Sequence, residues 1–229
     1  KPISVKAGKP MKIQVDYFQK TDMAVMQFDI VKNYTPIESQ LLAEVGDADV
    51  VVFVGGISPS LEGEEMKVSE PGFKGGDRTD IELPQAQRKV MEMLHRAGKR
   101  VVFVNCSGSA IAMVPETENA ESILQAWYPG ERGGEAVAKV LFGEVNPSGK
   151  LPVTFYKSTS DLPDFLDYTM KNRTYRYFKG EALFPFGHGL SYTSYEYGKP
   201  AVKKVKNEER KVKNSSAYSL SFSLSNKGN

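Results

Sequence analysis

Hydrophobic and polar residues alternate along the chain with two different periods. Near the start, residues 11–17 and 23–30 alternate apolar and polar positions around the polar segment 19–22. This pattern predicts two strands joined as a β-hairpin. Two strands alone are marginal in water, so we expect this hairpin to need a larger sheet or a partner surface.

The middle of the chain, residues 34–190, alternates amphipathic segments with short apolar runs. Apolar residues at helical spacing predict helices over 37–45, 84–97 and 133–142. Continuous apolar runs predict buried strands at 50–54, 101–104, 123–127 and 151–155. Such alternation is typical of a mostly parallel sheet covered on both faces. The predicted fold class is therefore α/β, an αβα sandwich flanked by partial β-sandwich segments.

After residue 190 the helical patterns stop. Residues 219–225 alternate serine with leucine or phenylalanine, which predicts a strand with one apolar face. We therefore expect three regions: a β-hairpin within 1–33, an α/β domain over 34–190, and the start of a β-sandwich over 191–229.

Composition and charge narrow the function classes. The chain has 229 residues with 40% hydrophobic and 25% charged positions, which is typical of a globular protein. A net charge of +2 gives no general attraction to nucleic acid or to an anionic membrane. No stretch is long and apolar enough to predict a membrane span. Lys1 is not a natural start, so the sequence is interpreted as an excised fragment from which targeting cannot be read.

Few residues could hold a metal or a cofactor. Cys106 is the single cysteine, which excludes an internal disulfide and a cysteine-based metal site. No metal-ligand spacing is present, and no G-x-G-x-x-G motif opens a helix after a strand. With two histidines in the chain, a Ser/His/acid triad has little support. We therefore expect no cofactor and no metal.

The candidate chemistry lies in the loop after the apolar run 50–54. This loop carries three clustered carboxylates, Glu62, Glu64 and Glu65. In α/β folds, sites form beyond the carboxyl ends of the strands, and a carboxylate there can act as a general acid if its surroundings keep it protonated. The alternative is an ordinary solvated loop.

Ordered motifs over residues 49–195 identify a resemblance to a known family. They are 49–56 (DVVVFVGG), 61–65 (LEGEE), 76–78 (GDR), 125–130 (QAWYPG), 146–152 (NPSGKLP), 173–178 (RTYRYF) and 184–192 (FPFGHGLSY). Together they resemble the second, C-terminal α/β domain of glycoside hydrolase family 3. The chain is most similar to Bacteroidetes-type β-glucosidases and β-xylosidases. In that comparison residues 1–33 resemble the end of a protective-antigen-type insert, and residues 191–229 the start of a fibronectin type III-like domain.

The resemblance implies a role for the carboxylate cluster. In the family, a (β/α)8 barrel that is absent here supplies an Asp nucleophile, and the second domain supplies the general acid/base. Glu64 matches the family's acid/base position by its motif. Because Glu65 stands where the family has glycine, Glu62 and Glu65 remain rivals for the role. Asp77 and Arg78 are expected to shape the loop.

The implied function is part of an exo-acting, retaining β-glycosidase. The partners would be a β-linked oligosaccharide or aryl glycoside and the absent barrel, and the fragment alone would be inactive. The location implied is periplasmic or secreted. The alternative is a non-catalytic carbohydrate-binding or interaction module. The choice between glucose and xylose, the linkage and the oligomeric state are left open.

Overall fold

A three-stranded parallel sheet forms the centre of the protein. The computed structural model describes residues 9–14, 37–68, 70–205 and 217–228. The sheet contains β1 (Val50–Gly56), β4 (Arg100–Cys106) and β5 (Ser122–Gln125) in the order β1-β4-β5. β1 pairs with β4 in register from Val50↔Arg100 to Gly56↔Cys106. The predicted α/β class with a mostly parallel sheet is thus confirmed, whereas the predicted N-terminal hairpin lies almost entirely outside the described residues.

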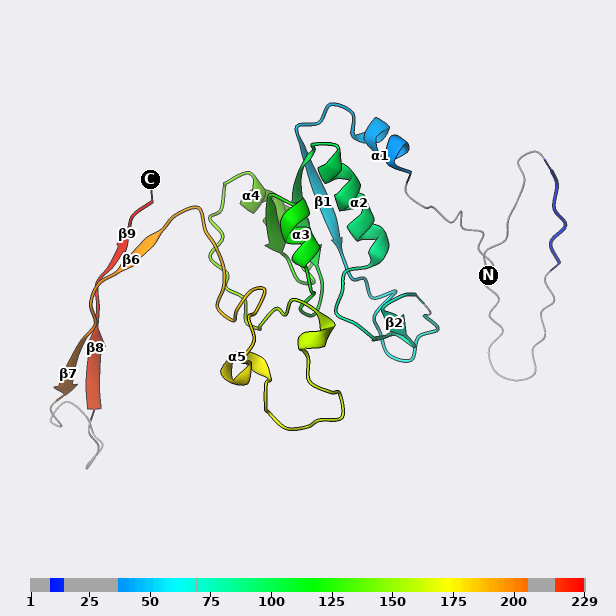
Figure 1. Ribbon diagram of the computed structural model, residues 1–229. Helices are drawn as coiled ribbons and strands as arrows, with labels where there is room; N and C mark the ends of the chain where they lie inside the picture. Colours follow the sequence, from blue (N-terminus) through cyan, green and yellow to red (C-terminus); the bar gives the residue numbers. More distant parts are fainter. Residues whose placement is uncertain (1–8, 15–36, 69, 206–216, 229) are drawn as a thin grey trace.

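Of the four described helices around the sheet, three lie in segments that the pattern predicted, and the one at Val114–Asn119 was not predicted. The four helices are α1 (Glu38–Val45), α2 (Gln85–Arg96), α3 (Val114–Asn119) and α4 (Gly133–Leu141). Figure 1 shows α2 lying along β1 and β4, with α3 beside it. α2 follows Pro84, whose fixed φ suits a helix start, and ends before Gly98 at a φ of 72°. None of the described helices combines the length and apolar character that a membrane span requires.

The hydrophobic core lies between α2 and one face of the sheet. Met91 and Leu94 of α2 pack against Val101 and Phe103 of β4, and all four are buried. Burying each such side chain stabilises the fold by about 1.5–3 kcal/mol. These apolar positions follow the helical and strand periods of the sequence, so the core was predictable from the pattern.

β1 is less buried than the sequence predicted. Val50, Val52 and Val54 are 41%, 49% and 65% exposed, while the intervening Val51 and Phe53 pack against the core. β1 lies at the edge of the described sheet, and α2 covers only one of its faces. The prediction of a fully buried strand is therefore wrong for β1.

The predicted strand over 151–155 is also wrong. Within that run only Phe155 makes a bridge, an isolated antiparallel one to Phe184. Pro152 has no N–H to donate to a ladder, which argues against a sheet strand here. Phe155 is fully buried, with its ring 6.0 Å from that of Trp127. The apolar run thus reflects core packing by an irregular segment.

β5 is shorter than predicted. β5 ends at Gln125, and Trp127 adopts a φ of 57°, which interrupts the extended backbone.

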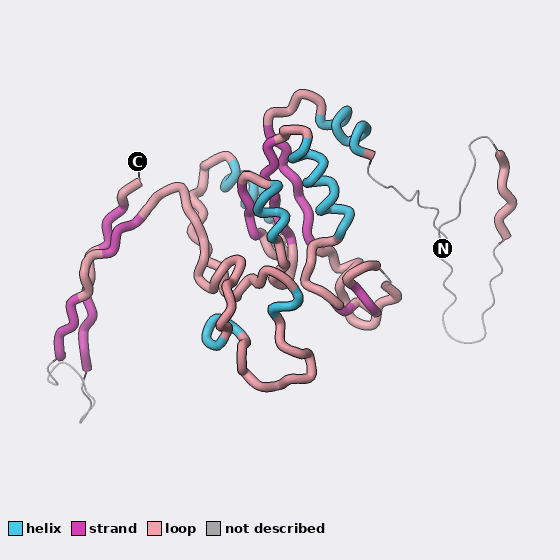
Figure 2. The backbone as a smooth tube through the Cα atoms, viewed as in Figure 1, coloured by secondary structure: helices cyan, strands magenta, loops and turns pink. Residues whose placement is uncertain are grey.

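The chain after residue 190 forms β structure as predicted, but the single strand predicted over 219–225 is wrong, because Phe222 and Ser223 separate two strands. The later strands are β6 (Tyr195–Tyr197), β7 (Ala201–Val205), β8 (Ala217–Ser221) and β9 (Leu224–Asn226). They pair antiparallel as β6–β9 and β7–β8, and Figure 2 shows them as a narrow ribbon extending from the α/β body. The domain boundaries at 33/34 and 190/191 stay predictions.

Candidate functional site

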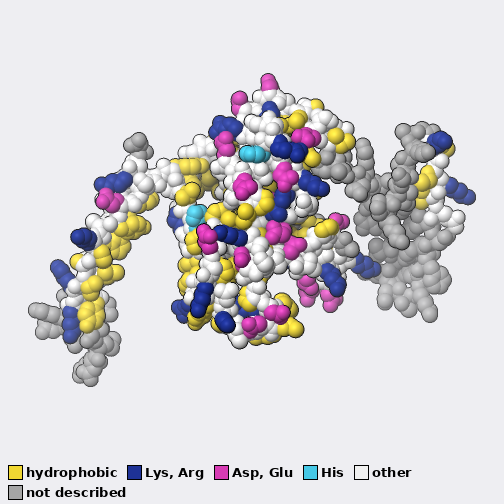
Figure 3. Space-filling model, viewed as in Figure 1, with side chains coloured by type: hydrophobic (Ala, Val, Ile, Leu, Met, Phe, Trp, Pro, Cys, Tyr) yellow, Lys and Arg dark blue, Asp and Glu magenta, His cyan; other side chains and the backbone are white. Residues whose placement is uncertain are grey.

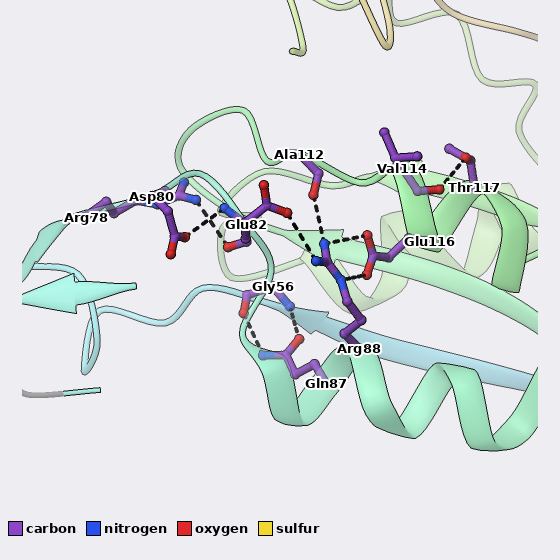
Figure 4. Close-up of polar contacts among 10 residues, drawn as sticks. All are labelled: Gly56, Arg78, Asp80, Glu82, Gln87, Arg88, Ala112, Val114, Glu116 and Thr117. Carbon is purple, nitrogen blue, oxygen red and sulfur yellow. Dashed lines mark hydrogen bonds and ion pairs between the residues drawn. The ribbon is translucent and has the colours of Figure 1, made fainter. Parts of the chain in front are cut away.

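The loop that carries the glutamates leaves the sheet at a fixed point. The side-chain amide of Gln87 on α2 makes two hydrogen bonds to the backbone of Gly56 (Figure 4). The Gly56 N–H donates to Gln87 Oε1, and Gln87 Nε2 donates to the Gly56 carbonyl oxygen, both at 2.7 Å. Gly56 has a φ of 125°, and a Cβ there would lie 1.9 Å from the Cys106 carbonyl oxygen. Only glycine fits this close approach of two strands, so the start of the loop is set by α2 and β4 together.

Glu64 and Glu65 occupy a turn whose two ends are tied to the same backbone segment. The Gly63 N–H donates to the Gly76 carbonyl at 3.1 Å, and the Met66 N–H donates to the Gly75 carbonyl at 2.8 Å. Both glutamates are exposed, and Glu65 has a left-handed φ of 50°. The turn therefore holds two carboxylates in solvent on a backbone that is fixed on both sides.

The segment that ties this turn is a short hairpin. It is formed by β2 (Phe73–Lys74) and β3 (Asp77–Arg78), which pair antiparallel around Gly75 and Gly76. A Cβ at Gly76 would lie 1.8 Å from the Gly63 carbonyl oxygen. The absence of a side chain at Gly76 is what allows the hairpin and the glutamate turn to approach so closely.

Glu62 has different surroundings from its two neighbours. It is half-buried, and its charge acts on the Arg78 guanidinium. Burial lowers the pKa of Arg78, and the negative charges of Glu62 and Asp80 oppose this shift. Glu62 thus differs from Glu64 and Glu65 in being half-buried and in acting electrostatically on Arg78.

Arg78 fastens the end of the loop to the neighbouring strand connection. Its Nη1 donates to Ser109 Oγ at 2.9 Å, and its Nε donates to the Asp80 carbonyl at 3.1 Å. Asp77 is exposed, and no side-chain bond of Asp77 is found within the described ranges. Arg78 thus joins the end of the loop to the segment after β4, and Asp77 pairs through its backbone with Lys74. The loop-shaping roles of both residues stay predictions.

A buried ion pair next to the loop was not found by sequence reasoning. Arg88 on α2 donates to both carboxylate oxygens of the fully buried Glu116, at 2.7 and 3.1 Å (Figure 4). It also donates to Glu82 Oε2 and to the Ala112 carbonyl oxygen, each at 3.1 Å. Burial alone would lower the pKa of Arg88, but the bonds to Glu116 and Glu82 raise it. The cluster joins α2, α3 and the end of the loop, and no local motif links these distant residues.

The end of β4 carries a buried polar cluster that is structural in its contacts. Asn105 Nδ2 donates to Gln125 Oε1 at 2.6 Å, and the Ser107 hydroxyl donates to the Ser109 carbonyl at 2.9 Å.

The two histidines of the chain lie apart from these serines in their contacts. His95 is exposed on α2, and the ring of His188 stacks on the ring of Phe184, with 5.0 Å between the ring centroids. In the described part of the chain no serine is hydrogen-bonded to a histidine, so a serine-nucleophile site receives no support.

The arrangement can transfer protons. An exposed carboxylate on a fixed turn, at the carboxyl edge of a parallel sheet, can reach a ligand that binds outside this domain. Across the described ranges, no three His, Cys, Asp or Glu side chains are grouped to hold a metal ion. Carboxylates are among the side chains that can act as general acids or bases.

Comparisons with known proteins agree with this picture. Residues 7–192 match the family described as "Glycosyl hydrolase family 3 C-terminal domain". A xylan 1,4-beta-xylosidase of Xylanibacter ruminicola is 55% identical over 201 residues, which cover 86% of this chain and 23% of that protein. A periplasmic beta-glucosidase of Salmonella typhimurium is 39% identical over 160 residues, covering 65% of this chain and 20% of that protein.

A solved structure shares the fold. Beta-glucosidase 3B from Thermotoga neapolitana, solved in complex with glucose, superposes with a TM-score of 0.63 at 25% identity. The superposition covers 84% of this chain and 27% of that one. The chain thus spans between a fifth and about a quarter of the length of the xylosidase and glucosidase relatives that it matches.

Proposed function

The chain belongs to glycoside hydrolase family 3 as its C-terminal domain, and we propose that it supplies the general acid/base of an exo-acting, retaining β-glucosidase or β-xylosidase. The substrates proposed are terminal β-linked sugars of oligosaccharides and aryl glycosides. Because the chain spans about a quarter of its xylosidase relative, we propose that a separate part of a longer polypeptide, a (β/α)8 barrel, supplies the nucleophile. A periplasmic or secreted location is proposed from the periplasmic relative.

The observation that carries this proposal is the tied turn around Glu64. Glu64 is exposed at the apex between two backbone bonds, to Gly76 and Gly75, so its carboxylate can project beyond this domain. Glu62 is half-buried, and its negative charge opposes the lowering of the Arg78 pKa by burial. Glu65 follows in a left-handed conformation. Among the three glutamates, Glu64 is therefore proposed as the acid/base, with Glu62 as a structural counter-charge.

The proposed mechanism uses two carboxyl groups in two steps. The nucleophile of the barrel attacks the anomeric carbon while protonated Glu64 donates its proton to the departing oxygen. Glu64, now a carboxylate, then removes a proton from the water that cleaves the glycosyl-enzyme intermediate. Retaining enzymes hold these groups about 5–5.5 Å apart. Arg78 and Gly76 would serve this reaction by fixing the backbone on which Glu64 is carried.

The test is a leaving-group comparison in the full-length enzyme. Glu64→Ala should lower turnover by about 10²–10⁴-fold on substrates with poor leaving groups, and much less on good ones that depart without a proton. Azide needs no deprotonation, so it should restore part of the rate on activated substrates and yield a glycosyl azide. Glu62→Ala and Glu65→Ala are the matched controls and should show neither effect. If one of them shows both effects while Glu64→Ala behaves as wild type, the assignment within the cluster is wrong.

A further inference from the structure

Gln87 completes the hydrogen bonding of the last residue of β1. Among the described strands, β1 pairs with β4 on one side only, and an edge strand leaves backbone N–H and C=O groups unpaired on its other side. At Gly56 the side-chain amide of Gln87 binds both groups, at 2.7 Å each. An amide offers a carbonyl acceptor and an NH₂ donor side by side. It therefore takes the place that one residue of a neighbouring strand would fill.

The side chain of Gln87 is held firmly on its own side of this contact. Gln87 is half-buried on α2, and the next residue, Arg88, is bonded to the buried Glu116. A Cβ on Gly55 would lie 2.4 Å from Gln87 Oε1, so the amide packs directly against the backbone of β1. Groups carried on a helix are placed more precisely than groups carried on a loop. The contact therefore ties the end of β1 to a rigid element.

The contact lies at the point where the glutamate loop begins. Gly56 has a φ of 125°, and glycine has more backbone freedom than any other residue. Figure 1 shows the chain running from the end of β1 to the β2 hairpin, and Figure 3 shows Asp and Glu side chains at the surface beside that hairpin. The direction of the backbone at Gly56 therefore affects where the loop carries Gly63 and Glu64.

We propose that Gln87 is a positioning residue for the acid/base: by binding the backbone of Gly56, it holds the loop so that the carboxyl group of Glu64 can reach the departing oxygen. The inference rests on the proposed function, because it names a residue that serves the same site. A misplacement of about 1 Å at a catalytic group can cost about 10²-fold in rate. A residue that only stabilised the fold would instead lower the rate by the same factor on every substrate.

The kinetic test compares two equal substitutions on one helix of the full-length enzyme. Gln87→Met removes the donor and the acceptor and keeps the length of the side chain, while Gln85→Met makes the same change at the exposed first residue of α2. Gln87→Met should lower kcat on poor leaving groups at least about tenfold more than on good ones and leave KM within about twofold. Gln85→Met should follow wild type. Thermal unfolding of both variants checks that they are folded at the assay temperature, and an equal loss on all leaving groups, or no loss, would overturn the positioning role.

A second measurement follows the loop itself and is independent of the chemistry. Hydrogen–deuterium exchange of the full-length protein is read at the Gly56 amide by mass spectrometry with electron-transfer fragmentation. Exchange should be at least about threefold faster in Gln87→Met than in Gln85→Met, because the amide has lost its acceptor. Equal exchange would overturn the proposal.

The two proposals fail in different ways. If Glu64→Ala behaves as wild type, the assignment of the acid/base is refuted, whatever the exchange at Gly56 shows. If Glu64→Ala shows the expected leaving-group dependence and Gln87→Met does not, the positioning role of Gln87 alone is refuted.

Discussion

Gly76→Ala should displace Glu64 without removing any functional group. The added Cβ would lie 1.8 Å from the Gly63 carbonyl oxygen, which belongs to the residue directly before Glu64. Gly75→Ala is the matched control, because Gly75 also has a positive φ but its nearest contact would be the Met66 carbonyl oxygen at 3.9 Å. Both variants carry the cost of a left-handed alanine, and only Gly76→Ala adds a collision with backbone.

The expected loss of rate in Gly76→Ala follows from the distance between the added Cβ and the Gly63 carbonyl oxygen. To reach an ordinary contact of 3.4 Å, the Gly63 carbonyl must move by about 1.6 Å, since packed atoms do not interpenetrate. A misplacement of about 1 Å at a catalytic group can cost about 10²-fold in rate. Gly76→Ala should therefore lower kcat on poor leaving groups by at least about 10²-fold. The left-handed conformation costs about 1–3 kcal/mol in both variants.

The assay is steady-state hydrolysis by the full-length enzyme of aryl glycosides that differ in leaving-group pKa. Gly76→Ala should show a steeper dependence on the leaving group than wild type, and Gly75→Ala should follow wild type. Thermal unfolding of both variants checks that the proteins are folded at the assay temperature. Equal leaving-group dependence in the two variants would show that the close approach of Gly76 and Gly63 does not position the acid/base.

Two further predictions concern the buried ion pair and the isolated chain. Glu116→Ala leaves the Arg88 guanidinium with only Glu82 and the Ala112 carbonyl as partners, so urea denaturation of the chain should show a loss of about 3–5 kcal/mol. Glu121→Ala, which removes the exposed pair with Arg100, is the control and should cost far less, because solvent screens an exposed pair. A loss for Glu116→Ala no larger than that of the control would contradict the reasoning. The 229-residue chain alone should release no nitrophenol from nitrophenyl β-glucosides or β-xylosides, because an acid/base without a nucleophile cannot form the glycosyl-enzyme. Reproducible release by the purified chain would refute the proposal that the nucleophile lies in another part of the polypeptide.

Local patterns in the sequence were sufficient for much of the fold. Pro84 and Gly98 bracket α2, and the apolar run of β4 predicted a buried strand that the structure confirms. The position of the glutamate loop after β1 also followed from the chain order of strand, turn and helix. These features depend on neighbouring residues, which is why period and capping rules could find them.

Features that depend on distant residues were not predictable in this way. Arg88 and Glu116 meet only because α2 and α3 pack together. The exposed face of β1 depends on which strands are its neighbours, which an apolar run does not encode. Among the glutamates, Glu62 is half-buried and acts electrostatically on Arg78, sixteen residues later in the chain, whereas Glu64 is exposed.

The outer edge of β1 makes this chain prone to associate with itself in concentrated solution. Among the described strands, β1 pairs with β4 on one side only, and its other side leaves backbone N–H and C=O groups beside exposed Val50, Val52 and Val54. Natural edge strands are protected by lysine, proline or a bulge, and β1 contains no lysine or proline. Strand-to-strand pairing along this edge is therefore one intermolecular contact expected as the concentration rises. Storage at low concentration, or a lysine in place of Val52, would keep such assemblies from forming.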